Sequence, residues 1–171
     1  MKKRGFTLIE LIVVIAIIAV LAAIIAPTAF RAIEKARISS TLEDVATIRT
    51  GAMSYFADVG SWPLNCTASP CTTDFVNNTG VRANWDGPYV EKWPATNRWG
   101  GNYTWGIIYS GWGTSGLEAR YVQINNVPNA TIDKIDTQVD GSINGADNST
   151  GNVHFNKTAG TVQILVSKDP G

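Results

Sequence analysis

The first half of the chain is dominated by apolar positions in a helical pattern. From Gly5 to Phe30 the only charged residue is Glu10, and residues 11–26 are all Leu, Ile, Val or Ala. About 20 apolar residues in a helix span the hydrocarbon core of a bilayer. The pattern therefore predicts a membrane-spanning helix over residues 6–27.

The helical pattern continues beyond this apolar run. Mostly apolar side chains recur at steps of three and four residues, and most charged residues fall off that line. The positions on the line are Phe30, Ile33, Arg37, Thr41, Val45, Ile48, Ala52 and Phe56. An apolar stripe must be buried against folded protein, so we expect an amphipathic helix over residues 28–58. Pro27 should bend or loosen the helix where the two halves meet.

The rest of the chain, residues 59–171, predicts a globular head. From Gly60 to Gly116 the composition is rich in Trp, Tyr, Gly and Pro without any long period, which is typical of an irregular loop. Four segments alternate apolar and polar residues and predict strands: NYTWGIIY, EARYVQINN, GNVHFN and TVQILVS. Short connections favour an antiparallel sheet with one face on the helix. The predicted fold class is α+β.

Charge gives the apolar helix an orientation. The 171 residues have a formal net charge of zero, and Lys2, Lys3 and Arg4 lie directly before the apolar run. Basic flanks stay in the cytoplasm, so the chain after the helix lies outside. No Ala-x-Ala triplet precedes Arg31, so the usual cleavage site of a secretory signal is missing. The remaining chain is acidic and offers no broad basic surface, so we expect no nucleic-acid partner.

The N-terminal motif is more specific than its hydrophobicity. A basic leader, Gly5 before Phe6, Glu10 at the fifth position after the glycine and an apolar helix with Pro27 resemble the N-terminus of type IV pilins and pseudopilins. The resemblance implies that a prepilin peptidase removes residues 1–5 by cutting between Gly5 and Phe6, and methylates the new N-terminus. It also implies the pilin fold, with an irregular loop between the long helix and the sheet.

Glu10 then has a candidate partner. A carboxylate in hydrocarbon is costly unless it is paired. Cleavage creates an α-amino group on Phe6 that is charged at neutral pH, and Glu10 of a neighbouring subunit can neutralise it inside a helical bundle. We expect Phe6 and Glu10 to pair between subunits during filament assembly. The alternative is a membrane anchor whose Glu10 lies near the lipid headgroups.

The loop after the helix extends the resemblance. Gly60, Trp62 and Pro63, followed by GPYV, a Trp-Pro pair and RWGGNYTW, are similar to the loop and first strand of major pseudopilins of type II secretion. Asn97 and Arg98 depart from the Asp-Pro of that family. The resemblance implies a major pseudopilin that drives protein export. A type IV pilus subunit for adhesion, motility or DNA uptake is the alternative.

The resemblance also implies partners and a location. The partners are further copies of the chain, the prepilin peptidase, an inner-membrane assembly platform, minor pilins or pseudopilins, and membrane lipid before assembly. The protein is expected to cross the bacterial inner membrane once with a periplasmic head, and then to enter a periplasmic or extracellular filament.

The two cysteines, Cys66 and Cys71, lie five residues apart in a polar loop. If that loop is outside the cytoplasm we expect a disulfide; two unpaired thiols are the alternative.

The Trp-rich segment favours two interpretations. It can be a ligand platform, which would make the chain a membrane-anchored binding module and would involve Trp62 or Trp85. It can also be packing, and the resemblance implies structural roles for Trp99 and Tyr103. We favour packing, because a loop-rich head with little regular structure needs large side chains to exclude water.

One late stretch, DTQVDGSINGAD, matches the spacing of a calcium loop, with Gly141 at the sharp turn. Its oxygen-bearing residues are Asp136, Gln138, Asp140, Ser142, Asn144 and Asp147. Asp-Gly and Asn-Gly are also ordinary turn dipeptides, and we favour plain turns over Ca²⁺. The only histidine, His154, alternates as a strand residue. We find no motif for a catalytic nucleophile or a phosphate loop, and expect no enzymatic activity.

Overall fold

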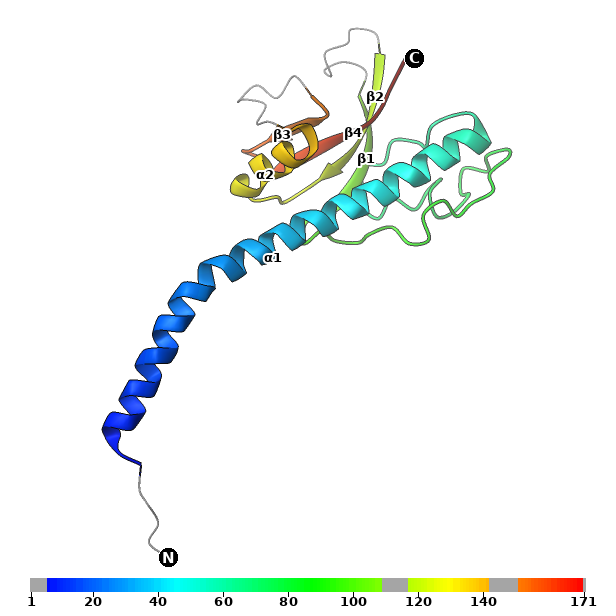
Figure 1. Cartoon of the computed structure of the whole chain (residues 1–171). Coiled ribbons are helices and arrows are strands. Elements are labelled where there is room, and N and C mark those ends of the chain that lie inside the picture. Colours follow the sequence, from blue (N-terminus) through cyan, green and yellow to red (C-terminus); the bar gives the residue numbers. More distant parts are fainter. Residues whose placement is uncertain (1–5, 109–116, 142–150, 171) are drawn as a thin grey trace, which may run out of the picture. The chain divides into compact units, whose positions relative to one another are not determined.

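The computed structural model describes residues 6–108, 117–141 and 151–170. The chain divides into two compact units, the first ending at Arg37 and the second beginning at Ile38. Figure 1 shows the elements. In chain order they are α1 (Leu8–Val59), β1 (Tyr103–Ile108), β2 (Leu117–Ile124), α2 (Asn129–Asp140), β3 (Val153–Asn156) and β4 (Thr161–Pro170).

The first unit contains the apolar part of α1. Every side chain from Phe6 to Ile33 is exposed in the isolated chain. The helix is long and apolar enough to cross a membrane. Pro27 lies inside α1 and does not end it, and the Thr28 hydroxyl donates to the carbonyl of Ile25 at 2.7 Å. Since a helix that is apolar on all sides is not stable in water, lipid or other helices must cover this segment.

In the second unit α1 buries one stripe against the sheet and the loop. The buried positions are Ile38, Thr41, Val45, Ile48, Gly51, Ala52 and Tyr55. The predicted stripe is correct from Thr41 to Ala52 and wrong at both ends. At its start Phe30, Ile33 and Arg37 are exposed, and at its end Phe56 is 40% exposed whereas Tyr55 is fully buried.

The buried face of α1 includes Tyr55 rather than Phe56 because the loop that contains Tyr89 and Val90 packs on the side of α1 that carries Gly51. A Cβ atom at Gly51 would lie 2.6 Å from Cγ2 of Val90 and 2.9 Å from the carbonyl oxygen of Tyr89. Only glycine allows this approach. The same loop covers Tyr55, whose ring meets that of Tyr89 edge-on at 5.4 Å.

Within the described residues, the strands form one antiparallel sheet in the order β1-β2-β4-β3. The register pairs Tyr103 with Ile124, and Val162 with both Ile124 and Phe155. These residues belong to the buried face, which forms one core with α1 and α2. All the predicted strands are confirmed within a few residues at their ends. The opposite face carries half-buried side chains such as Tyr121, which lies across Gly106.

Helix α2 was not predicted. It follows Pro128 and ends at Gly141, whose left-handed backbone (φ 78°) lets its N–H donate to the carbonyl of Thr137 at 3.0 Å. Ile132 and Ile135 are fully buried in the core. A proline before the helix and a glycine after it are ordinary helix boundaries. The Asp-Gly pair that was interpreted as a turn is therefore the C-terminal cap of a helix.

Candidate functional site

The N-terminus of α1 positions Glu10 through a reciprocal pair of contacts with Thr7. The backbone N–H and the hydroxyl of Thr7 both donate to Oε2 of Glu10, at 2.9 and 2.7 Å. The N–H of Glu10 in turn faces Oγ1 of Thr7 at 3.3 Å. This arrangement is a capping box, which satisfies N–H groups that the first turn of a helix leaves unpaired. The sequence analysis expected the partner of Glu10 to lie outside the apolar segment. It missed Thr7, which lies within that segment.

Phe6 and Glu10 lie at the same groove. A groove of about 370 Å³ on α1 is lined by Phe6, Ile9, Glu10, Val13 and Val14. Phe6 precedes the first residue of the helix and is 79% exposed. Gly5, the other residue of the predicted cleavage site, lies outside the described residues. The arrangement leaves a carboxylate in apolar surroundings, where a cation from another molecule is the favourable partner.

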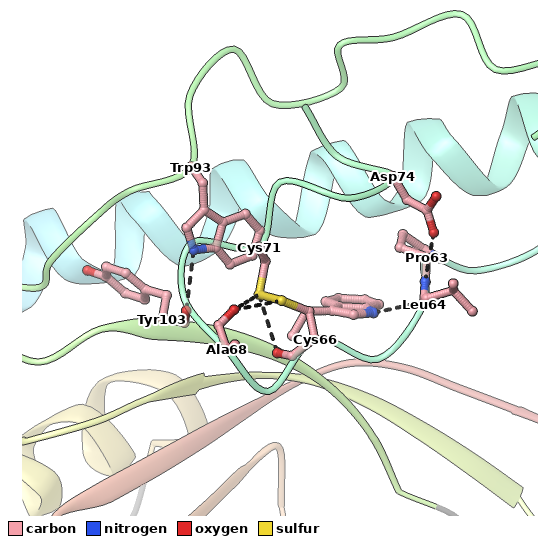
Figure 2. The surroundings of a disulfide bond; sticks show 9 residues. Pro63, Leu64, Cys66, Ala68, Cys71, Asp74, Trp93 and Tyr103 are labelled. Atoms are coloured by element: carbon pink, nitrogen blue, oxygen red, sulfur yellow. Dashed lines mark hydrogen bonds between the residues drawn. A yellow bond between two sulfur atoms is a disulfide. The ribbon is translucent and has the colours of Figure 1, made fainter. Parts of the chain in front are cut away.

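The loop between α1 and β1, residues 60–102, contains a disulfide. Cys66 and Cys71 are joined with their Cα atoms 5.7 Å apart, and Cys71 is fully buried in the core (Figure 2). Cys66 also pairs with Trp105 through two backbone hydrogen bonds, of 2.8 and 3.1 Å. The disulfide therefore closes the segment that lies along the outer edge of β1.

We expect replacement of both cysteines by Ala to lower the free energy of unfolding of the head by about 2 kcal/mol, the chain-entropy value for a loop this short. Denaturant unfolding of the full chain in detergent, followed by near-UV circular dichroism, measures the loss. Wild-type protein treated with a reductant is the matched control and should lose a similar amount. Equal stability of the oxidised, reduced and substituted proteins would contradict a stabilising role.

Of the tryptophans in the described residues, two are buried and three, Trp62, Trp85 and Trp99, are half-buried. Trp93 and Trp105 are buried, and their indole N–H groups donate to the carbonyls of Tyr103 and Pro63, at 3.3 and 3.1 Å. Figure 2 shows the ring of Trp93 beside the disulfide. Trp62 is half-buried and stacks on Phe56 with ring centroids 4.6 Å apart. These contacts favour packing over a ligand platform.

The contacts of Asn97 explain why asparagine stands where the pseudopilin pattern has aspartate. Its Oδ1 accepts from the N–H groups of Trp99 and Gly101, at 2.9 and 3.0 Å, and its Nδ2 donates to the carbonyl of Asn125 at 2.6 Å. An aspartate can accept the first two bonds but cannot donate the third. Asn97 therefore links the loop to the end of β2. The next residue, Arg98, donates twice to the hydroxyl of Ser40 on α1.

Tyr103 also joins α1 to the sheet. Its hydroxyl donates to Oδ2 of Asp44 at 2.8 Å, and burial together with this carboxylate raises the pKa of Tyr103 well above its usual range. Burial, reinforced by the charge of Lys168, lowers the pKa of His154. These environments indicate structural roles.

The first part of the predicted calcium loop lies in α2. Asp136, Gln138 and Asp140 lie in α2, where side chains two residues apart do not face each other. Asp136 is fully buried, and Asp140 accepts from the N–H groups of Asn152 and Val153 at the start of β3.

The remaining calcium candidates, Ser142, Asn144 and Asp147, lie outside the described residues. Among the described ones, no group of three His, Cys, Asp or Glu side chains is arranged to hold a metal. Calcium binding stays a prediction.

Two family models match the chain. The model of the prokaryotic N-terminal methylation motif matches residues 1–26, and the model described as PilW, C-terminal, matches residues 32–108. The first match includes Thr7 and Glu10. The second includes the head part of α1, the loop with its disulfide, and β1. No curated protein and no solved structure matches the chain. The matches do not single out the major pseudopilin.

Proposed function

Because the chain is a type IV pilin-like protein, we propose that it is a filament subunit that assembles through its N-terminal helix. After removal of residues 1–5, the segment from Phe6 to about Ala26 leaves the membrane and joins the core of a helical polymer. The polymer contains further copies of the chain.

One observation carries the proposal: the apolar part of α1, up to Phe30, is exposed along its whole length and has a single charged residue, Glu10, near its start. A bilayer covers apolar side chains but not a carboxylate, whereas a bundle of identical helices can cover both. Assembly therefore removes the one unfavourable feature of the membrane-bound subunit.

Pairing between subunits fixes their offset. Phe6 precedes α1, and the Glu10 carboxylate reaches back to the backbone nitrogen of Thr7. If the amine of one subunit meets the carboxylate of the next, the two helices are displaced along their axis by the distance that separates these two groups within one chain. The same pair repeats at each addition, because every subunit brings one amine and one carboxylate. This head-to-tail arrangement gives an open polymer rather than a closed ring.

The proposed partners follow from this sequence of cleavage and assembly. The prepilin peptidase acts on the membrane-inserted chain, an inner-membrane assembly platform adds it to the filament, and other pilins share the polymer. Membrane lipid covers α1 before assembly. The head is periplasmic at that stage.

We assign the filament to a type IV pilus. The PilW match spans residues 32–108, which include the segments that resemble the major pseudopilin. A major pseudopilin of type II secretion is the second candidate. It is favoured by the GPYV and RWGGNYTW segments, although Asn97, directly before the second segment, stands where the family has aspartate.

Deletion of the gene in its own host, with complementation by wild type and by Glu10→Ala, tests the assignment. We expect the deletion strain to lose surface pili and to keep its set of secreted proteins, and only the wild-type gene to restore the pili. Loss of secreted proteins with normal pili would favour the pseudopilin. No change in either would overturn the filament-subunit proposal.

A further inference from the structure

We propose that Arg31, Lys35 and Arg37 form a basic belt that binds anionic phospholipid headgroups at the outer surface of the membrane. The basic belt acts in the membrane-bound subunit, before assembly, so the proposal rests on that stage of the proposed function. It adds the class of lipid and the residues that select it.

The basic belt comes directly after the apolar run of α1. The helix begins at Leu8, and from there to Phe30 it rises about 34 Å, at about 1.5 Å per residue. The hydrocarbon core of a bilayer is about 30 Å thick, and the headgroup layer adds about 5–8 Å on each side. Residues 31–37 rise a further distance of about 10 Å. They therefore pass through the outer headgroup layer.

The three basic side chains are available to a partner outside the chain. All three are exposed, and among the described residues none of them forms an ion pair. Arg31 and Lys35 are about one turn apart on the same side of α1, whereas Arg37 lies on another side. Phe30 and Ile33, which are 72% and 50% exposed, lie between and beside them. Long basic side chains in this setting keep their apolar stems in the hydrocarbon and their charges at the level of the phosphates.

The charge of the basic belt favours an anionic lipid over a neutral one. Residues 31–37 contain three basic residues and one acidic residue, Glu34, which gives a net charge of +2. Basic residues are depleted on the outer side of membrane-spanning helices, so a cluster there indicates an anionic partner. Each basic residue near an anionic lipid surface favours binding by a factor of about five, or about 1 kcal/mol. The phosphates of anionic lipids have the complementary charge and lie at the same depth as the basic belt.

The test uses the protein purified from its host and reconstituted in vesicles of phosphatidylcholine and phosphatidylglycerol. Electron spin resonance of spin-labelled lipids gives the ratio of the association constants of phosphatidylglycerol and phosphatidylcholine for the protein. We expect wild type to prefer phosphatidylglycerol, and the preference to fall at about 1 M salt, where charges are screened. Replacement of all three basic residues by Gln should lower the ratio at least about fivefold, the factor for one basic residue.

Three single substitutions separate the basic belt from the net charge of the protein. Glu34→Gln removes the acidic charge within residues 31–37 and should raise the ratio. Lys35→Arg keeps the charge and should leave the ratio unchanged. Lys92→Gln is the matched control for Lys35→Gln, because it removes the same charge from an exposed position of the loop in the head. It should have no effect.

The outcomes bear on different claims. A triple variant with the ratio of wild type, or equal losses in Lys92→Gln and Lys35→Gln, would overturn the basic belt and leave the filament-subunit proposal intact. An unchanged ratio together with a lower filament yield of the triple variant in the host would assign the basic belt to an acidic surface of a neighbouring subunit instead. A wild-type protein that is washed from the vesicles by alkaline carbonate would contradict the membrane-bound stage itself.

Discussion

Replacement of Glu10 by Ala is expected to abolish filament assembly while insertion into the membrane and cleavage continue. The substitution leaves the amine of the neighbouring Phe6 buried without a counter-charge. Removing one partner of a buried ion pair costs about 3–5 kcal/mol. That cost lowers the assembly equilibrium by a factor of roughly 100 or more at each added subunit. Filament yield is measured as the sheared surface fraction relative to the total protein.

Glu43→Ala is the matched control for this prediction. Glu43 is also an acidic residue of α1, it is exposed, and it belongs to the head. Its replacement should leave filament yield unchanged. If Glu10→Ala assembles as well as Glu43→Ala, the pairing of Phe6 with Glu10 is not what drives assembly.

Trp105→Ala is expected to destabilise the head strongly, lowering its free energy of unfolding by about 3–5 kcal/mol. Trp105 is fully buried, meets Phe75 edge-on at 5.5 Å between ring centroids, and donates to the carbonyl of Pro63. Its replacement leaves a cavity and an unpaired carbonyl. Denaturant unfolding of the full chain in detergent, followed by near-UV circular dichroism, measures the loss.

The control for Trp105 is Leu64→Ala, one residue after Pro63. Leu64 is 52% exposed and should change the free energy of unfolding by less than about 1 kcal/mol. A Trp105→Ala protein that is as stable as Leu64→Ala would show that the tryptophan is not part of the core. The ligand-platform interpretation of the Trp-rich segment would then regain support.

The long helix and the strands could be predicted because their patterns are long and regular. The helical period persists from Phe30 to Ala52, and each strand alternates over several residues. Which side of α1 is buried near its end could not be predicted in the same way. That choice depends on where the loop packs, and the contact between Gly51 and Val90 has no signal in the helical pattern.

Helix α2 shows how one short pattern supports two structures. The segment from Asp136 to Gly141 has the spacing of a calcium loop and also the glycine that ends a helix. Ile132 and Ile135, three residues apart before it, were the signal for the helix. Because the apolar stripe of a twelve-residue helix is short, the acidic residues after it dominated the interpretation.

Only one of the two contacting residues of the candidate site, Glu10, was identified from the sequence. The charge of Glu10 in an apolar run was sufficient to identify it, since such a residue needs a partner. Thr7 was missed, although Thr-x-x-Glu before an apolar run is the usual pattern of a capping box. The cost of a buried charge suggested a partner on another subunit. The hydroxyl of Thr7, three residues before Glu10, was overlooked for that reason.

A density map of the assembled filament at side-chain resolution tests the central claim most directly. The quantity to measure is the distance from the amine nitrogen of Phe6 in one subunit to the nearest carboxylate oxygen of Glu10 in the next. We expect that distance to be within about 4 Å, the range of an ion pair. A filament in which each Glu10 contacts only its own chain, with the Phe6 amines elsewhere, would contradict the account.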